Sequence, residues 1–199
     1  MGVGIYTLAE AARLSRVSAG RIKRWVRGYS FRDERGNERS SPPLWTPQHA
    51  SDDIISFRDL VEVRFVDAFL RHGVSWPVLR ASGEKAAEIL ATTHPFSHEA
   101  FKTDGRKIFL DVIGRSRGSR QIVDAFSDQL AFVEVLKPFL FGIKFDRRSE
   151  PTEWWPLGEN HNVLISPDHS FGQPIVARAG ILTRVLANGF QAEGDARKV

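Results

Sequence analysis

Residues 6–28, YTLAEAARLSRVSAGRIKRWVRG, decide the fold of this chain because they predict two short helices separated by a turn. Thr7 and Glu10 form the T-x-x-E pattern of a capping box, which begins the first helix. Ser18 is the N-cap candidate of the second helix, and Gly28 closes that helix as a C-terminal glycine does. Two helices joined by a turn of about three or four residues are typical of a helix-turn-helix.

The second helix is amphipathic, with one apolar side and one basic side. Ile22, Trp25 and Val26 fall at i, i+3 and i+4, which predicts the face that the core buries. Stepping about 100° per residue, the outward face consists of Gly20, Lys23, Arg24 and Arg27, with Arg21 at its flank. Long cations on the free side of a buried helix suit a recognition helix that reaches phosphates and guanine edges. A solvated surface face is the alternative interpretation.

The polar stretch after Gly28 predicts a basic hairpin. Arg35-Gly36-Asn37 has the composition of a hairpin tip, and Arg32 and Arg39 flank it. Such a hairpin would act as a wing, which places further cations on the nucleic-acid backbone beside the recognition helix. The predicted DNA-binding residues are Ser18, Arg21, Lys23, Arg24, Arg27, Arg32, Arg35 and Arg39.

The charge of the chain is concentrated at this end. The 199 residues include 28 Lys+Arg and 24 Asp+Glu, a formal net charge of +4. Residues 1–39 hold nine basic and four acidic side chains, a net +5, whereas the rest of the chain carries a net −1. A confined basic region is expected of a nucleic-acid-binding module, although a solvated basic tail would have the same charge.

The composition excludes several other classes of protein. Hydrophobic residues make up 42% and charged residues 26%, which is typical of a globular chain. The absence of cysteine excludes disulfides and thiolate metal sites. No apolar run approaches ~18 residues, and residues 1–15 lack the pattern of a secretory signal. We therefore expect a soluble cytoplasmic protein without a membrane partner.

Helices and strands alternate through the rest of the chain. Ser56 and Asp59 predict a capping box for a helix that ends at Gly73, and a further helix starts at Ser75. Helices are predicted over residues 121–136 and 181–189 and strands over 107–112, 139–145, 162–165 and 175–177, with a connection at 153–156. The expected fold class is α+β and mainly helical: an N-terminal winged helix-turn-helix, a small antiparallel sheet and a C-terminal helical segment.

Patterns that indicate catalysis are weak. His94 and His98 have i, i+4 spacing, but Pro95 opposes a continuous helix and no third metal ligand is near. Residues 168–170, Asp-His-Ser, have the types of a hydrolytic triad, yet adjacent residues cannot form one by themselves. Residues 52–53 are two aspartates in a predicted loop, where solvated charge is the usual meaning. We expect no catalytic residue, no metal and no cofactor, and therefore no enzyme.

Aromatic residues beyond the basic end are candidates for a dimer or partner interface. Phe65 and Phe69 lie on the predicted helix over residues 57–72, and Phe126 begins another apolar region. Trp154 and Trp155 form a pair of the kind that anchors interfaces, with a place in the core or a platform for a sugar or base as the alternatives.

Two stretches of the sequence resemble known families. Residues 6–14 with Trp25 and Gly28, followed by residues 57–62, are similar to the winged helix-turn-helix of MerR-like regulators. Residues 94–96, 101–105, 171–176 and 180–183 resemble the small domain of unknown function found in many bacterial VapB-type antitoxins. The resemblance covers nearly the whole chain and divides it into a DNA-binding domain, residues 1–92, and an antitoxin-type domain, residues 93–199. Members of that family continue into a second helix-turn-helix, so the chain is expected to stop partway through one.

The resemblance implies a function that composition and spacing do not reach. It implies an antitoxin that binds its operator DNA as a homodimer, regulates its own transcription and neutralises a VapC-type toxin, a PIN-domain ribonuclease. The alternative is a MerR-like transcriptional regulator that senses a small molecule and has no toxin partner. Its pocket would use Trp76, Phe96, Phe101 or Trp154.

Overall fold

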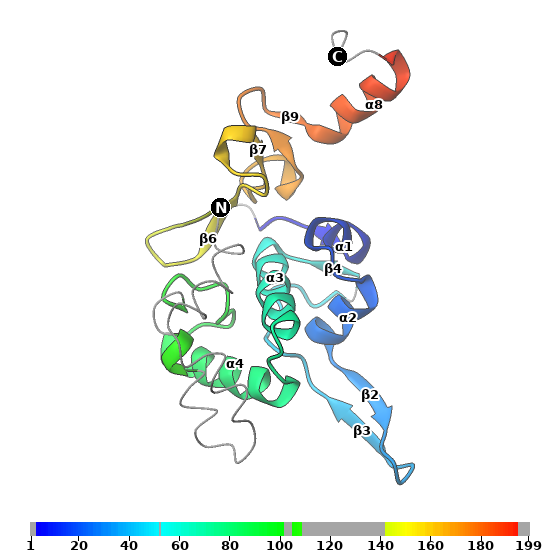
Figure 1. Cartoon of the computed structure of the whole chain (residues 1–199), viewed down its shortest axis with the longest axis vertical. Coiled ribbons are helices and arrows are strands. Elements are labelled where there is room, and N and C mark those ends of the chain that lie inside the picture. Colours follow the sequence, from blue (N-terminus) through cyan, green and yellow to red (C-terminus); the bar gives the residue numbers. More distant parts are fainter. Residues whose placement is uncertain (1–2, 52, 102–104, 109–141, 195–199) are drawn as a thin grey trace.

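A computed structural model describes residues 3–51, 53–101, 105–108 and 142–194 of the chain (Figure 1). Its fold is α+β, as the sequence predicts. The N-terminal half consists of β1 (Tyr6–Thr7), α1 (Leu8–Ser15), α2 (Ala19–Arg27), β2 (Tyr29–Arg32), β3 (Glu38–Ser41), β4 (Ile54–Ile55), α3 (Phe57–Arg71) and α4 (Trp76–Leu90). The C-terminal part consists of β5 (Ile143–Phe145), β6 (Pro151–Trp154), β7 (Val163–Leu164), β8 (Ile175–Val176), β9 (Ile181–Leu182) and α8 (Thr183–Glu193).

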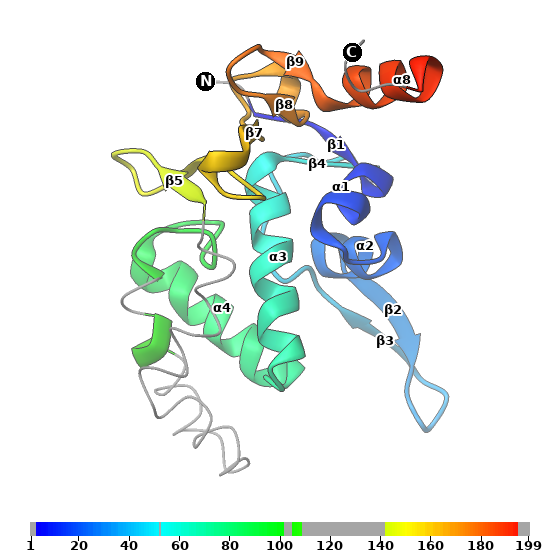
Figure 2. The same cartoon turned by 45° about the horizontal axis from the view of Figure 1, so that its top comes forward.

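Helix α3 is the centre of the molecule. Figures 1 and 2 show it between α1 and α2 on one side and α4 on the other. The capping box predicted at its start is present, because Ser56 Oγ accepts the backbone N–H of Asp59 at 3.0 Å while the Asp59 carboxylate accepts the N–H of Ser56 at 2.9 Å. Its apolar side chains are buried around nearly the whole helix, as expected of a helix enclosed by neighbours.

The strands form short, separate antiparallel sheets. β1 pairs with β4, β2 with β3 and β5 with β6, while β8 lies between β7 and β9. The β2–β3 hairpin projects away from the helices, and its register pairs Tyr29 with Ser41 and Arg32 with Glu38. The hairpin tip therefore lies at residues 33–37, which confirms the predicted turn.

Three predicted elements are wrong in part. Lys107 and Ile108 belong to a helical turn and not to a strand, and Ile108 is buried. Residues 151–154 form β6, where the sequence predicts a connection for residues 153–156. Residues 181–182 form β9, so the last helix begins only at Thr183. The sequence of a short apolar run does not distinguish helix from strand, because the segment against which the run packs decides which of the two forms. The helix over 121–136, the basic loop over 114–120 and Phe126 lie outside the described residues.

The C-terminal sheet region is fastened to the first helix. The Tyr6 hydroxyl donates to the Gly172 carbonyl oxygen at 2.7 Å, and Gln173 Nε2 donates to Glu10 Oε1 at 3.2 Å. Burial raises the pKa of the Tyr6 phenol, so the hydroxyl stays a donor. Gly172 has a φ of +85°, and an added Cβ would collide with the Tyr6 hydroxyl oxygen. These contacts hold Gly172 against β1 and Gln173 against α1.

Three of the predicted interface residues lie in the core instead. Phe65 and Phe69 are 1% and 0% exposed, because α3 is enclosed on the faces that carry them. Trp154 is also buried, with the Arg64 guanidinium 3.9 Å from the centre of its ring. Trp155 is half-buried, and its indole N–H donates to Glu153 Oε2 at 2.8 Å. Phe65, Phe69 and Trp154 are therefore core residues of the folded chain, and none of them presents the exposed surface expected of an interface anchor.

In the described part of the chain, no helix has both the length and the apolar character needed to cross a membrane.

Candidate nucleic-acid interface

Helix α2 presents one face to the core and one to solvent. Ile22, Trp25 and Val26 are buried, as predicted from their spacing. The turn before the helix places Ser18 at the N-cap, but its side chain makes no capping hydrogen bond and is exposed. The local sequence thus determines both the helix and which face remains free.

Three cations lie on or beside the free face. Lys23 and Arg24 are exposed. The side chain of Arg21 is 41% exposed, and its Nη1 lies 3.5 Å from Asp67 Oδ1 on α3. The Arg21 guanidinium also lies over the Trp25 ring at 4.8 Å, a cation–π geometry. Arg21 is therefore oriented by the core, whereas Lys23 and Arg24 extend from the helix.

Arg27 is used differently from the other predicted contacts. Its guanidinium donates to the carbonyl oxygens of His49, Ser51 and Ile54, with the first at 2.7 Å and the last at 2.9 Å. These bonds fasten the loop before β4 to the end of α2. We assign Arg27 to this structural task and omit it from the candidate interface.

The β2–β3 hairpin carries the other predicted cations. Arg32 and Arg35 are exposed, and Arg39 Nε lies 3.1 Å from Asp33 Oδ2. Asp33 organises the tip, because its carboxylate also accepts the backbone N–H of Asn37 at 2.9 Å. The pKa of Asp33 is lowered, mainly by this hydrogen bond from Asn37 and further by the hydrogen bond from the Arg39 side chain. Part of the Arg39 charge is thus balanced inside the hairpin.

The base of the hairpin is joined directly to α2. Gly28 has a φ of +76°, and an added Cβ would collide with the Ser41 carbonyl oxygen, so only glycine fits this close approach. After the hairpin, the Leu44 N–H donates to the Trp25 carbonyl oxygen at 2.8 Å. The basic helix and the basic hairpin therefore belong to one unit.

Two aromatic residues on the hairpin were not predicted. Tyr29 and Phe31 are 38% and 45% exposed, with ring centres 5.8 Å apart. The Arg24 guanidinium lies 5.9 Å from the Tyr29 ring. The signal in the sequence is their i, i+2 spacing, which puts both side chains on one side of a strand.

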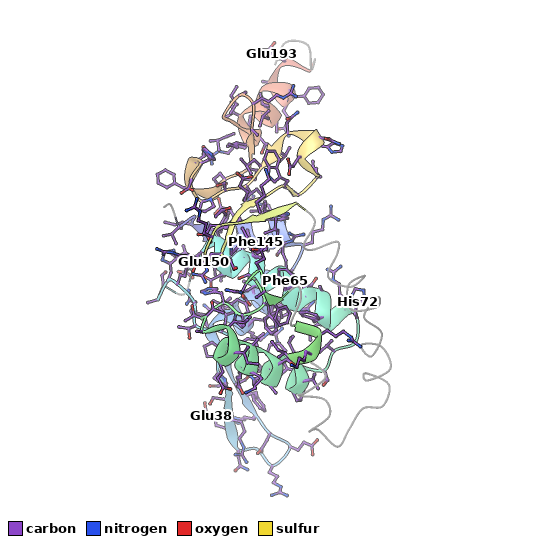
Figure 3. The ribbon with its side chains drawn as sticks, turned by 90° about the vertical axis from the view of Figure 1, so that its left-hand side faces the viewer. Glu38, Phe65, His72, Phe145, Glu150 and Glu193 are labelled. Carbon is purple, nitrogen blue, oxygen red and sulfur yellow. The ribbon has the colours of Figure 1, made fainter. Side chains whose placement is uncertain are left out.

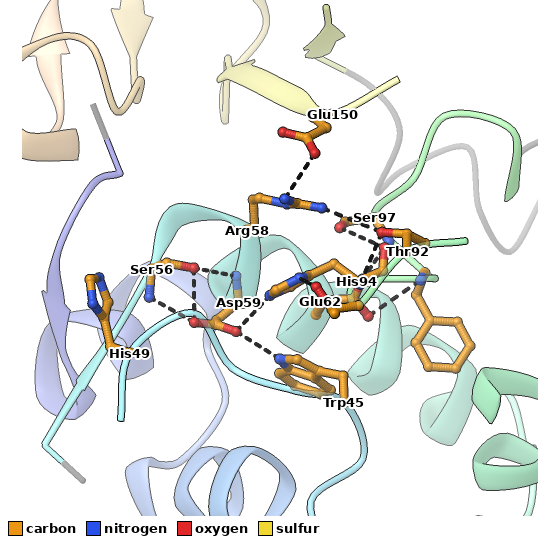
Figure 4. Close-up of polar contacts among 12 residues, drawn as sticks. Trp45, His49, Ser56, Arg58, Asp59, Glu62, Thr92, His94, Ser97 and Glu150 are labelled. Carbon is orange, nitrogen blue, oxygen red and sulfur yellow. Dashed lines mark hydrogen bonds and ion pairs between the residues drawn. The ribbon is translucent and has the colours of Figure 1, made fainter. Parts of the chain in front are cut away.

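Beneath this unit lies a buried polar cluster centred on Asp59 (Figure 4). Asp59 Oδ1 accepts the indole N–H of Trp45 at 2.7 Å and lies 2.9 Å from His94 Nε2. Burial alone would raise the pKa of Asp59, but the hydrogen bond and charge of His94, with donors from Ser56 and Trp45, hold that pKa below its usual value. The cluster links the loop after the hairpin to α3 and to the segment after α4.

Glu62, one turn further along α3, holds the same segment. Its carboxyl oxygens accept the backbone N–H groups of Ser97 at 2.8 Å and Phe96 at 3.3 Å. Complete burial raises the pKa of Glu62 to about 8, against the opposing effect of these hydrogen bonds. The sequence identifies Asp59 only as a cap and offers no signal for Glu62.

The residues suggested for a small-molecule pocket belong to the hydrophobic core. Phe96 and Phe101 pack edge to face, Trp154 is buried in the same core cluster, and Trp76 packs against that cluster and stacks on Trp25. His94 belongs to the Asp59 cluster. Among the residues that the structure describes, no three His, Cys, Asp or Glu side chains are grouped to hold a metal ion.

Comparison with known proteins finds a similar sequence and a similar structure from Mycobacterium tuberculosis. No protein-family model matches the sequence. Over 193 residues the chain is 26% identical to a protein of Mycobacterium tuberculosis (strain ATCC 25618 / H37Rv) named "Putative antitoxin VapB45", across 90% of this chain and 79% of that protein. The X-ray crystal structure of Rv2018 from Mycobacterium tuberculosis matches with a TM-score of 0.69 and 20% identity, over 94% of this chain and 86% of that one. The chain thus shares the fold of Rv2018 and is similar in sequence to a protein named as an antitoxin.

Proposed function

We propose that this protein is the antitoxin of a type II toxin–antitoxin system, which binds operator DNA as a homodimer and neutralises a VapC-type PIN-domain ribonuclease. In this proposal it is not an enzyme and needs no cofactor. The name of the similar Mycobacterium tuberculosis protein supports the antitoxin role. The observation that carries the DNA-binding role is the joined basic unit of α2 and the β2–β3 hairpin.

The DNA-contacting set follows from the free cations of that unit. Lys23 and Arg24 reach from α2 into the major groove, and Arg32 and Arg35 contact flanking phosphates from the hairpin. Arg21 and Arg39 contribute with their charges partly balanced by Asp67 and Asp33. A single short recognition helix reads few bases, so a two-fold dimer is expected on the operator.

Binding measured across a salt series tests this proposal. Wild type, Arg24→Ala and Arg35→Ala are titrated with a duplex spanning the promoter of the protein's own gene. If Arg24 reads a base, Arg24→Ala should cost ~1–3 kcal/mol of binding free energy and relax sequence specificity at one position of the operator. Removal of Arg35 should weaken all sequences alike and flatten the salt slope by ~0.9 for each phosphate that is no longer neutralised.

Arg178→Ala is the matched control, because Arg178 lies between β8 and β9, away from α2 and the hairpin. It removes the same charge and should leave both affinity and slope unchanged. If neither Arg24→Ala nor Arg35→Ala differs from this control, the DNA-binding assignment is overturned.

The toxin-binding surface is proposed at the other end of the molecule. Figure 3 places Glu38 of the hairpin and Glu193 of α8 at opposite ends. The C-terminal part exposes large apolar side chains that the chain itself leaves uncovered, namely Leu157, Phe171, Ile181, Val185 and Phe190. Exposed apolar side chains that gather on one part of a protein mark interaction sites.

Phe171 is the strongest single candidate for a partner anchor. It is 78% exposed, and its φ of +55° is unusual for a residue with a large side chain. The Ile5 N–H donates to its carbonyl oxygen at 3.1 Å, so the backbone is held while the ring remains exposed. Co-expression with the product of the neighbouring reading frame, followed by co-purification, should recover a complex with wild type and lose it with Phe171→Ser. Recovery of the complex with both wild type and Phe171→Ser, or with neither of them, contradicts this assignment.

A regulator that senses a small molecule is the second candidate, and one observation favours it. An open groove of about 530 Å³ lies between the loop after the hairpin, α4 and the segment after α4. Pro43, Trp45, Arg80 and Thr93 are among its lining residues. This is a different place from the predicted pocket. A change of DNA affinity caused by a small molecule, and abolished by Ala87→Leu at the groove wall, would support this candidate over the antitoxin.

A further inference from the structure

Four side chains from two helices form one stack beside the basic unit. The Arg21 guanidinium lies 4.8 Å from the centre of the Trp25 ring on α2. Trp25 and Trp76 stack with ring centres 6.5 Å apart and an interplanar angle of 27°. The Arg80 guanidinium of α4 lies 5.5 Å from the centre of the Trp76 ring. The stack thus contains two indoles, each of which meets a guanidinium.

Arg80 also forms hydrogen bonds with the last residue of the hairpin and the two residues that follow it. Its Nη2 donates to the Pro42 carbonyl oxygen at 2.8 Å and to Ser41 Oγ at 3.1 Å, and its Nη1 donates to the Pro43 carbonyl oxygen at 3.1 Å. Ser41 is the residue of β3 that pairs with Tyr29 at the base of the hairpin. The planar fork of an arginine suits such a set of acceptors, which a lysine ammonium matches poorly.

The other end of the stack is held by α3. Asp67 is almost fully buried, and its carboxylate oxygens lie 3.5 Å from Arg21 Nη1 and 2.6 Å from Arg71 Nε. The recognition helix is therefore held through Arg21 and Trp25, while the hairpin is held through Arg80. Trp76 connects the two.

We propose that Trp76 and Arg80 are positioning residues that fix the orientation of the β2–β3 hairpin relative to helix α2. The orientation itself follows from contacts within the chain, and its consequence for DNA rests on the proposed function. Because the Arg80 nitrogens Nη1 and Nη2 are occupied by the hairpin exit, Arg80 acts through the hairpin and not on a phosphate. Helix α4 thus takes part in DNA recognition without touching DNA.

The first test measures orientation without DNA. The chain has no cysteine, so Gly20→Cys on α2 and Glu34→Cys at the hairpin tip give two unique sites for spin labels. A Cβ at Gly20 meets nothing within 4 Å, and Glu34 is exposed. Pulsed electron paramagnetic resonance measures the distribution of distances between the two labels. This distribution should be narrow in the doubly labelled chain with Arg80 intact and broader when Arg80→Ala is added. Arg80→Lys should also broaden it, because the charge remains but the fork is removed.

Lys85→Ala is the matched control on the same helix, since it removes a positive charge that pairs with Glu88 on α4 itself. It should leave the distance distribution unchanged. Trp76→Leu should broaden the distribution as Arg80→Ala does. Circular dichroism and the unfolding midpoint establish that each variant is folded before its distances are compared. An unchanged distribution in folded Arg80→Ala and Trp76→Leu overturns the proposal.

The second test separates positioning from a direct role on DNA. Arg80→Ala should lower DNA affinity about tenfold in the wild-type background, but should leave affinity and salt slope unchanged when Arg32 and Arg35 are already alanine, because it acts through the hairpin. A residue that neutralises a phosphate itself would flatten the slope by a further ~0.9 in that background. A further flattening by Arg80→Ala there therefore overturns the positioning role. If wild type binds no duplex DNA, the proposed function fails, and the distance measurement still decides whether Trp76 and Arg80 orient the hairpin.

Discussion

Helices α2 and α8 are both short and amphipathic, but the chain treats their apolar faces in opposite ways. Helix α2 buries Ile22, Trp25 and Val26 and turns Lys23 and Arg24 outward. Helix α8 buries no residue, and Val185 and Phe190 remain 54% and 49% exposed. Figure 1 shows α8 at one end of the molecule and α2 nearer the middle, beside α1 and α3.

This difference shows how one chain can offer two kinds of surface. Packing against α1 and α3 satisfies the apolar side of α2, so the surface that is left is charged and suits a polyanion. Helix α8 adjoins the edge of a small sheet, so its apolar side stays exposed, which is a feature of interaction sites. The same amphipathic pattern thus yields a basic surface or an apolar one, depending on what lies behind the helix.

The largest effect expected from this comparison is on stability, at the buried side of α2. Ile22→Ala should lower the free energy of unfolding by ~2–5 kcal/mol, because Ile22 is 0% exposed and a cavity would replace its side chain. Lys23→Ala, its exposed neighbour, should change that free energy by less than ~0.5 kcal/mol. Urea unfolding followed by tryptophan fluorescence measures both. Equal effects of the two substitutions would mean that α2 does not rest on the core.

The second prediction concerns α3, the helix against which α2 packs and for which α8 has no counterpart. Because the pKa of Glu62 is about 8 in the folded chain and near 4.5 when the chain is unfolded, the folded state binds more protons between these values. Stability should therefore fall as pH rises from about 5 to about 8, by at most ~1.4 kcal/mol per pH unit. Glu62→Gln should flatten this dependence, which unfolding at pH 5, 6.5 and 8 would reveal. A slope that Glu62→Gln leaves unchanged would assign the pH dependence to another group.

The smallest effect on stability is expected at α8. Phe190→Ser removes a half-exposed ring, so the free energy of unfolding should change by less than ~0.5 kcal/mol. Under the proposed function, the same substitution should weaken binding to the protein partner, measured by titration calorimetry with the protein recovered by co-purification. A loss of stability comparable to that of Ile22→Ala would show that the α8 face already belongs to the core, and the comparison between the helices would fail.

Local signals in the sequence predicted the N-terminal half well. The capping boxes at Thr7 and Ser56 are present, and the hairpin tip lies at the predicted turn. These features depend on residues close together in the chain, whose hydrogen bonds form whatever the rest of the fold does. The burial of Ile22, Trp25 and Val26 was predicted for the same reason.

Longer-range features were beyond the reach of the sequence. Phe65 and Phe69 were predicted at an interface, but the enclosure of α3 puts them in the core. Arg27 has the helical position of a DNA contact, yet three carbonyl oxygens of a distant loop occupy its guanidinium. No spacing rule predicts which neighbour an exposed-looking side chain will meet when its partner lies far away along the chain.

The sequence by itself determined where helix α2 and the hairpin begin and end, which face of α2 is basic, and that the positive charge gathers in the first 39 residues. The tertiary structure alone decided which of those cations remain free. It also decided that Asp59 and Glu62 are buried, that Trp76 and Arg80 join helix to hairpin, and that α8 keeps its apolar face exposed. The physical reason is that local hydrogen bonds and periodicity act over a few residues, whereas burial, desolvation and ion pairing depend on segments that only folding brings together.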